Sequence, residues 1–255
     1  MRVGLIIEYE GTRYNGFQFQ TNGRSIQGEI EDGLSQLTGA HTRIYGAGRT
    51  DSGVHALGQV VAFDTDSNIS LSRFITGLNY YLPNDIAVKS AYQVGNYFNP
   101  RHEAQSRKYR YTILNSITPS PLDRRFTYLV IKQLNDEIMN QAAKTLIGTR
   151  DFAPFSGPLK TKEMKTIRTI YFSEVVRLGS KILFEIRGSA FLPQQVRRIV
   201  GTILKVGQGK MLFDEFLYIA NSTFRGAAKN VAPPHGLCLV EVTYTNFPPR
   251  LENIK

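Results

Sequence analysis

The sequence predicts an α+β protein made of two similar halves, each with a sheet covered on one face by helices. The first reason is that segments with apolar residues at every second position alternate with segments of helical period. The second is that the second half of the chain follows the first in this style, although no exact repeat is present. The chain of 255 residues, 42% of them hydrophobic, is long enough for two ordinary domains. We expect these at 1–105 and 106–255.

The first half contains the clearer pattern. One helix is expected to begin at Ser25, a good N-cap, and to carry Ile26, Ile30, Leu34 and Leu37 on one face. The next helix is expected to end before a turn at Pro83. The pattern predicts strands at about 2–9, 41–46, 58–65 and 85–94, and helices at about 25–38 and 70–81.

The second half follows with helices expected at about 134–147, 193–206 and 213–221, and strands at about 107–114, 168–177, 181–189 and 237–245. Pro193 suits the first turn of its helix. The segment from Pro154 to Lys162 has the composition of a mobile surface loop.

Composition excludes several classes of protein. A net charge of +10 and a pI near 9.7 favour a polyanionic partner, nucleic acid before an anionic membrane surface. No run approaches the roughly 20 apolar residues that cross a bilayer, and the first residues alternate like a strand rather than a signal peptide. The single cysteine, Cys238, excludes an intrachain disulfide and a cysteine-cluster zinc site. The expected location is the cytoplasm.

A glycine-rich stretch from Gly46 to Gln59 is the most informative feature of the chain. It holds Asp51 between an arginine and a hydroxyl, ahead of a strand-like run that would brace it. Its glycines (Gly46, Gly48, Gly53 and Gly58) are expected to adopt positive φ and bring the acid close to a ligand. An aspartate beside an arginine stays ionised, as a nucleophile requires. The competing interpretation is an ordinary turn-forming aspartate.

Two further segments carry candidate functional residues. On the strand near 107–114, Arg107, Tyr109 and Tyr111 share one face, and the tyrosines either meet a ligand or simply cover the core. In the helix near 193–206, Arg198, Thr202 and Lys205 are expected to form a polar face. Arg197 is expected to point inward, where it needs an acid or a phosphate.

Other chemistries find little support. The four histidines (His41, His55, His102 and His235) are scattered without metal-ligand spacing, and His55 is expected to act as a structural hydrogen-bonding group. No P-loop or dinucleotide fingerprint is present. Asp64 and Asp66 lie beyond the strand after Asp51, so a glycosidase-like carboxylate pair is not expected.

The string Gly48-Arg49-Thr50-Asp51-Ser52-Gly53-Val54-His55-Ala56 closely resembles the catalytic loop of the TruA-like tRNA pseudouridine synthases, GRTDxGVHA. Four more segments resemble strings of that family: the early YxGFQxQ segment from Tyr14 to Gln20, Phe98 to Tyr111, Phe191 to Gly201, and Ala232 to Val242. The resemblance therefore covers nearly the whole chain. One departure is Pro193-Gln194-Gln195, where the family more usually has Arg or His with Met.

The resemblance implies two ferredoxin-like halves joined into one extended, mostly antiparallel sheet, with helices on one face and the active cleft between the halves. It implies isomerisation of uridine to pseudouridine on the 3′ side of the tRNA anticodon loop and stem, at roughly positions 38–40. The reaction would need no cofactor and no metal, and the family works as a homodimer.

The resemblance also implies the roles of single residues. Asp51 would be the nucleophile, Tyr109 would stack on the target base, and Arg197 would pair with Asp51, whereas Tyr111 would pack. Arg49 would contact the RNA backbone and help extrude the nucleotide, and Leu237 would border the uracil pocket. The further candidate phosphate contacts are Arg24, Arg101, Arg107, Lys108 and Arg198.

Two alternatives stay open from sequence. One is a non-catalytic RNA-binding or tRNA-folding protein on the same scaffold, and the other is a synthase acting on another RNA or position.

Overall fold

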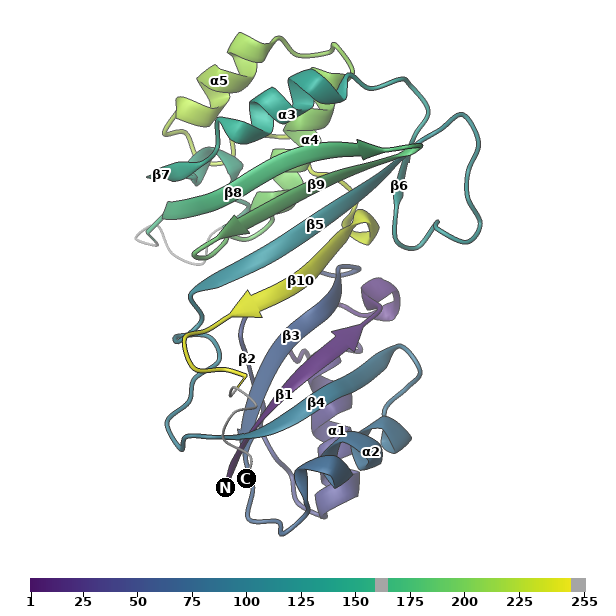
Figure 1. The fold of residues 1–255 in the computed structure, drawn as a ribbon, viewed down its shortest axis with the longest axis vertical. Helices are drawn as coiled ribbons and strands as arrows, with labels where there is room; N and C mark the ends of the chain where they lie inside the picture. Colours follow the sequence, from purple (N-terminus) through teal and green to yellow (C-terminus); the bar gives the residue numbers. More distant parts are fainter. Residues whose placement is uncertain (159–164, 249–255) are drawn as a thin grey trace. The chain divides into compact units, whose positions relative to one another are not determined.

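The computed structural model describes residues 1–158 and 165–248, which form two compact units (Figure 1). Unit 1 comprises Met1–Ser106 together with the described residues from Leu239 on, and unit 2 comprises the described residues of Arg107–Cys238. The expected domains, 1–105 and 106–255, stay a prediction. The last part of the chain, from Leu239 on, belongs to unit 1, because the chain returns to unit 1 after completing unit 2.

Unit 1 is an antiparallel sheet with two helices on one face (Figure 1). Side chains of β1 alternate, so Val3, Leu5 and Ile7 are fully buried in the core. Helix α1 begins after Ser25, whose side chain accepts a hydrogen bond from Gly28 N. The strands are β1 (Arg2–Tyr9), β2 (Tyr45–Gly46), β3 (His55–Asp64), β4 (Ile86–Val94) and the part of β10 (Leu237–Thr243) from Leu239 on, in the order β4-β1-β3-β10 with β2 beside β3. The helices are α1 (Ile26–Thr38), α2 (Leu71–Tyr81) and the 3-10 turn η1 (Gly11–Arg13).

Unit 2 repeats this plan with three helices. Helices α3 and α4 pack closely because Gly207 has no side chain; a Cβ there would lie 2.4 Å from the sulfur of Met139. The strands are β5 (Ser106–Asn115), β6 (Tyr128–Val130), β7 (Gly148–Asp151), β8 (Ile167–Leu178) and β9 (Lys181–Gly188), in the order β5-β9-β8-β7 with β6 parallel to β5; the helices are α3 (Asp136–Lys144), α4 (Gln195–Gly207), α5 (Phe213–Asn221), η2 (Ala153–Phe155) and η3 (Pro234–Gly236).

The predicted α+β class with mostly antiparallel strands and helices is confirmed. The joining of two halves and a cleft between them stay predictions. Strands β6 and β7, of three and four residues, were not predicted because they are too short to show a period of two. The predicted strand at 41–46 pairs only at Tyr45–Gly46.

Two local predictions about unit 2 are wrong. Pro193 does not start the helix: α4 begins at Gln195, its N-cap Gln194 has a left-handed φ of 57°, and Pro193 O accepts the Gly157 N–H instead. The segment from Pro154 to Gly157 is not a surface loop, because it is buried and includes η2. The rest of that predicted loop, at 159–162, lies outside the described residues.

An ion pair between the exposed Arg13 and the buried carboxylate of Asp85 joins the turn after β1 to the turn before β4. The carboxylate of Asp85, 8% exposed, accepts hydrogen bonds from the Tyr14 hydroxyl and from Arg13, whose Nη2 lies 2.6 Å away. Burial raises the pKa of Asp85, but the hydrogen bonds from Tyr14 and Arg13 outweigh burial, so this pKa is lowered overall. Burial, together with the bond to Asp85, raises the pKa of Tyr14.

We expect Asp85→Asn to lower the free energy of unfolding at pH 7 by about 1–3 kcal/mol, since the hydroxyl of the buried Tyr14 and the guanidinium of Arg13 lose a charged acceptor. Because folding lowers the pKa of Asp85, its carboxylate stabilises the folded state fully above the pKa of the unfolded state, which is about 4. This stabilisation is lost as the pH falls through the lower pKa of the folded state. Urea unfolding at a series of pH values should therefore show the two proteins converging in acid. The exposed Asp66→Asn variant is the control. A difference in the free energy of unfolding between Asp85→Asn and the unaltered protein that is the same at every pH would contradict this explanation.

Candidate active site

The loop that carries Asp51, residues 47–54, runs from β2 to β3 and is tied to β3 at its start. The Ala47 N–H donates to Val60 O at 2.8 Å, and the fully buried side chain of Gln59 donates from Nε2 to Gly48 O at 3.0 Å. Within the loop, Val54 N donates to Asp51 O at 3.1 Å. The backbone on both sides of Asp51 is therefore held in one conformation.

A second set of contacts comes from the last residue of β1, Tyr9, and from Tyr14 and Phe17 in the segment after it; these contacts are here called the loop clamp. Phe17 N donates to Thr50 O at 3.1 Å, and the hydroxyls of Tyr9 and Thr50 hydrogen-bond at 2.8 Å in the core. Beyond the acid, Ser52 Oγ donates to Tyr14 O at 3.0 Å. Because the residues before and after Asp51 are both attached, the carboxylate is presented on a rigid support.

Glycines allow the segment after β1 to lie close to the Asp51 loop, but most of them do not adopt the predicted positive φ. Only Gly53 of the four loop glycines has a positive φ, of 77°. Gly46 and Gly58 serve instead as contact points, since a Cβ would lie 2.5 Å from the Phe17 ring and 2.7 Å from Val240 O respectively. The clamp needs Gly16, which was not predicted: its φ is 95°, and a Cβ would lie 2.7 Å from Thr50 O. Gly48 has neither a positive φ nor a close neighbour, and nothing in the structure explains it.

Two arginines of unit 1 accompany the loop. Arg49 and Arg101 are exposed, and partial desolvation, followed by the like charge of Arg101, lowers the pKa of Arg49. Asp51 itself is half-buried. The buried His55 accepts the Gly11 N–H at its Nδ1 at 3.0 Å, which confirms its structural role.

The two tyrosines of β5 differ. Tyr111 is fully buried, donates from its hydroxyl to Pro233 O at 2.9 Å, and has its pKa raised by burial, which confirms that it packs. Tyr109 retains 9% exposure and meets the edge of the Phe191 ring at a centroid distance of 5.2 Å. Tyr109 is thus supported on one side by a second aromatic ring.

The start of α4 presents two arginines with different surroundings. Arg197 and Arg198 are both half-buried, so burial does not distinguish the predicted inward direction of Arg197, which stays a prediction; its Nε donates to Ala232 O at 2.8 Å. Arg198 donates to Ala228 O at 2.7 Å and to the side chain of Gln194. The predicted polar face is wrong for Thr202, which is fully buried and donates back to Arg198 O at 2.7 Å. The segment near Asn230 covers this part of the helix, so closely that a Cβ on Gly201 would lie 2.4 Å from Asn230 O.

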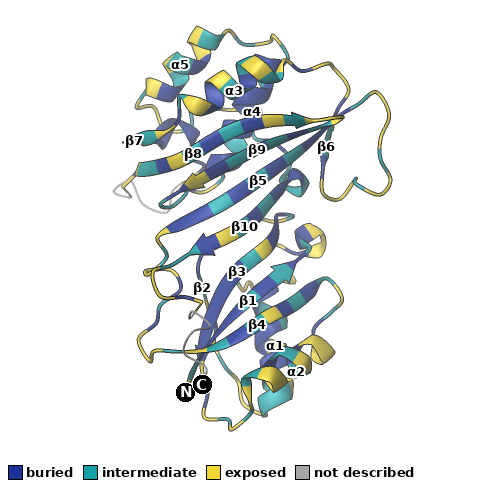
Figure 2. Ribbon diagram, viewed as in Figure 1, coloured by how far each residue is buried: buried dark blue, intermediate teal, exposed yellow. Residues whose placement is uncertain are grey.

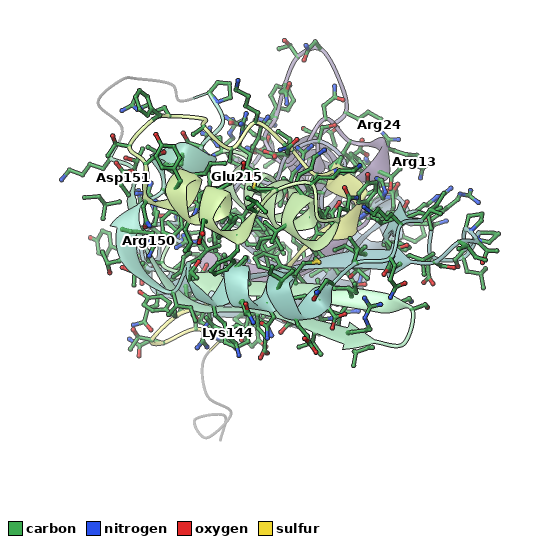
Figure 3. The ribbon with its side chains drawn as sticks, turned by 90° about the horizontal axis from the view of Figure 1, so that it is seen from above. Arg13, Arg24, Lys144, Arg150, Asp151 and Glu215 are labelled. Atoms are coloured by element: carbon green, nitrogen blue, oxygen red, sulfur yellow. The ribbon has the colours of Figure 1, made fainter. Side chains whose placement is uncertain are left out.

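The other residues predicted to contact RNA also lie against groups of the protein itself. Arg24 is labelled in Figure 3. Its Nε lies 2.7 Å from Glu29, and its guanidinium lies over the Tyr14 ring at 5.2 Å from the centroid. Lys108 pairs with Glu185 at 2.8 Å. The buried Arg107 donates to Ser189 O at 2.8 Å, and Leu237 is 5% exposed. A role of these side chains in binding RNA stays a prediction.

The predicted residues fall into both units. Asp51, Arg49, Arg101 and Arg24 belong to unit 1, whereas Tyr109, Arg197, Arg107, Lys108, Arg198 and Leu237 belong to unit 2. The pairing of Arg197 with Asp51 therefore stays a prediction. Among the described residues, no three His, Cys, Asp or Glu side chains gather as metal ligands, and no helix is long and apolar enough to cross a membrane.

Comparison with known proteins gives a consistent result. The model of the family described as tRNA pseudouridine synthase matches residues 5–102 and 142–245. Among curated proteins, "tRNA pseudouridine synthase A" of Geotalea uraniireducens (strain Rf4) is 43% identical over 95% of this chain and 99% of its own length. The protein of the same name from Acetivibrio thermocellus is 44% identical over 95% of this chain and 99% of its own length.

Among solved structures, "Crystal Structure of a Cbf5-Nop10-Gar1 Complex" aligns at 16% identity and a TM-score of 0.35, over 81% of this chain and 55% of that one. This likeness is too weak to carry an argument. The family match covers most of the sequence, including the loop of Asp51 and the start of α4. The chain belongs to the tRNA pseudouridine synthase family.

Proposed function

We propose that this protein isomerises uridine to pseudouridine in tRNA, on the 3′ side of the anticodon loop and stem, with Asp51 as the nucleophile. The observation that carries the proposal is the geometry around Asp51: a half-buried carboxylate on a loop held both by β3 and by the loop clamp. Membership of the family, and relatives named tRNA pseudouridine synthase A at 42–44% identity, support the formation of pseudouridine in tRNA.

The reaction conserves all atoms. The bond from C1′ to N1 of uracil breaks, the detached base turns, and a new bond forms from C1′ to C5. The proton on C5 is lost and N1 gains one, so no oxidant, metal or external group is required. The enzyme must therefore retain a free base while it turns, which favours a rigid, partly buried site.

Asp51 is proposed to act first, by attack on the ribose or the base or by removing a ribose proton. A carboxylate does each of these only when ionised. Arg197 is proposed to act on Asp51 as a positioning residue: its half-buried guanidinium, held at Nε by Ala232 O, is a cation of fixed orientation.

Tyr109 is proposed to stack on the target base and to accept the C5 proton, directly or through water. Its ring is supported by Phe191 and retains some exposure, whereas Tyr111 is fully buried. Leu237 would border the uracil as an apolar wall.

The backbone of the RNA is proposed to meet the basic side chains. Arg49 and Arg101 suit this best, because two exposed cations that repel each other gain from a shared phosphate. Arg24, Arg107, Lys108 and Arg198 are further proposed contacts, and each has a partner within the protein that the RNA would have to replace or share. We further propose that the protein works in the cytoplasm, as a homodimer, without cofactor or metal.

We expect Asp51→Asn to reduce tritium release from tRNA carrying uridine tritiated at C5 by about a thousandfold or more, while the dissociation constant for tRNA changes by about twofold at most. Asn keeps the size of the side chain but cannot act as a nucleophile. Asp66→Asn, an exposed carboxylate in the same unit, should release tritium normally. Release retained in Asp51→Asn would show a different nucleophile. No release from the unaltered protein, with tRNA binding intact, would favour an RNA-binding protein, and mapping the pseudouridines tests the position.

We expect Arg197→Lys to lower the turnover number by about a hundredfold with little change in KM, since Lys keeps the charge but loses the planar guanidinium. Arg198→Lys is the matched control on the adjacent position, and it should change KM more than the turnover number. Equal effects of the two substitutions on the turnover number would remove the special role of Arg197.

A further inference from the structure

The segment that follows β1, residues 11–17, lies directly against the Asp51 loop. A Cβ on Gly11 would lie 2.0 Å from Val54 O, so no side chain fits between the segment and the loop at that point. Gly16, in the same segment, makes a second contact of this kind. Both β1, which precedes the segment, and β3, which follows the loop, are largely buried (Figure 2). A displacement of the segment would therefore displace the loop.

Tyr14, within this segment, holds the two residues that follow the proposed nucleophile. Its backbone carbonyl accepts a hydrogen bond from Ser52 Oγ at 3.0 Å and one from the Gly53 N–H at 3.4 Å. The Tyr14 ring is 1% exposed, and it is attached to the same Cα as that carbonyl. Whatever fixes the ring therefore also fixes the support for the residues after Asp51.

Asp85 fixes the Tyr14 ring from the turn before β4. Its carboxylate accepts the hydrogen bond of the Tyr14 hydroxyl at Oδ1, and Arg13 donates to Oδ2. Its backbone carbonyl accepts the Glu10 N–H at 2.9 Å, so Asp85 contacts this part of the chain at three residues. The next residue, Ile86, begins β4, which pairs with β1. Asp85 is thus itself held by the sheet.

Stability alone gives a weak reason to bury this carboxylate. Removing a charge from water costs free energy, and an apolar group that fills the same space is often no less stable. A carboxylate adds direction, because each of its oxygens accepts a hydrogen bond from a particular side chain. Asp85 therefore specifies where the Tyr14 hydroxyl lies, which burial of an apolar ring would not do.

We propose that Asp85 and Tyr14 are positioning residues for Asp51. The hydrogen bond from the Tyr14 hydroxyl to Asp85 holds the Tyr14 carbonyl against the Asp51 loop, and the loop in turn places the Asp51 carboxylate for its reaction with the nucleotide. The inference rests on the reaction proposed above and adds two residues that act through the loop. Their contact is separate from that of Thr50, because it holds the other side of Asp51.

The test is the rate of a single turnover, followed by tritium release from tRNA, with the tRNA dissociation constant measured beside it. Tyr14→Phe keeps the ring and removes the hydroxyl, whereas Asp85→Ala removes the acceptor. Each should lower the rate about tenfold and leave the dissociation constant within about twofold. The double variant should be no slower than Asp85→Ala, because both changes remove the same hydrogen bond.

Asp85→Asn separates positioning from stability. It keeps an acceptor oxygen for the Tyr14 hydroxyl, so it should react within about threefold of the unaltered protein although it is less stable. Asp64→Asn is the matched control, because Asp64 forms an ion pair of the same length, 2.6 Å, with Arg2 at the other end of β1. Its rate should not change.

Amide hydrogen exchange of the peptide that contains the Asp51 loop gives a second readout, which does not depend on catalysis. Exchange should be about tenfold faster in Tyr14→Phe, because the loop opens more often, and unchanged in Asp64→Asn. Equal exchange in Tyr14→Phe and the unaltered protein would show that this hydrogen bond does not hold the loop, and it would overturn the proposal.

A Tyr14→Phe rate equal to that of the unaltered protein, or a loss confined to binding, would also overturn the proposal, as would an Asp85→Asn variant as slow as Asp85→Ala. Circular dichroism melting identifies a variant that does not fold, and Tyr14→Phe, which keeps the buried ring, then decides. If the unaltered protein releases no tritium, the proposed reaction fails, and hydrogen exchange alone decides whether Tyr14 and Asp85 position the loop.

Discussion

The candidate site depends on the two hydrogen bonds that hold Thr50 against β1 and the segment after it. Its carbonyl accepts the Phe17 N–H and its hydroxyl meets the hydroxyl of Tyr9, so the residue before Asp51 is attached to the segment after β1 and to the end of β1 itself. Gly16 allows that approach, because any side chain there would meet Thr50 O. A glycine-rich loop, which by itself would be mobile, becomes a rigid support for one carboxylate.

The second unit applies the same principle with a helix and a strand. The segment near Asn230 lies so close to α4 that Gly201 is required, and it supplies carbonyls to both Arg197 and Arg198. Likewise the ring of Tyr111 packs where a Cβ on Gly236 would lie 2.6 Å away. Backbone carbonyls thus orient the cations, while Tyr109, two residues before Tyr111 on β5, retains 9% exposure.

Much of the fold could be predicted from periodicity, and the misses have physical causes. The strand at Arg2–Tyr9 and the helix at Phe213–Asn221 agree with prediction because each has a full period and clear ends. Thr202 was misplaced because helical phase shows which residues share a side, but not which loop later covers that side. The Asp51 loop was visible in sequence, whereas its clamp joins residues more than thirty positions apart, and local pattern contains no such information.

The most direct test of the central claim is the rate of a single turnover on tRNA, measured beside the tRNA dissociation constant, for Thr50→Val and Thr50→Ser. Valine keeps the shape of threonine and removes the hydroxyl that meets Tyr9, whereas serine keeps the hydroxyl. The account predicts a turnover rate about tenfold or more lower in Thr50→Val, restoration in Thr50→Ser, and unchanged binding in both. An unchanged rate in Thr50→Val, or a loss confined to binding, would contradict the claim that this contact positions Asp51 for the reaction.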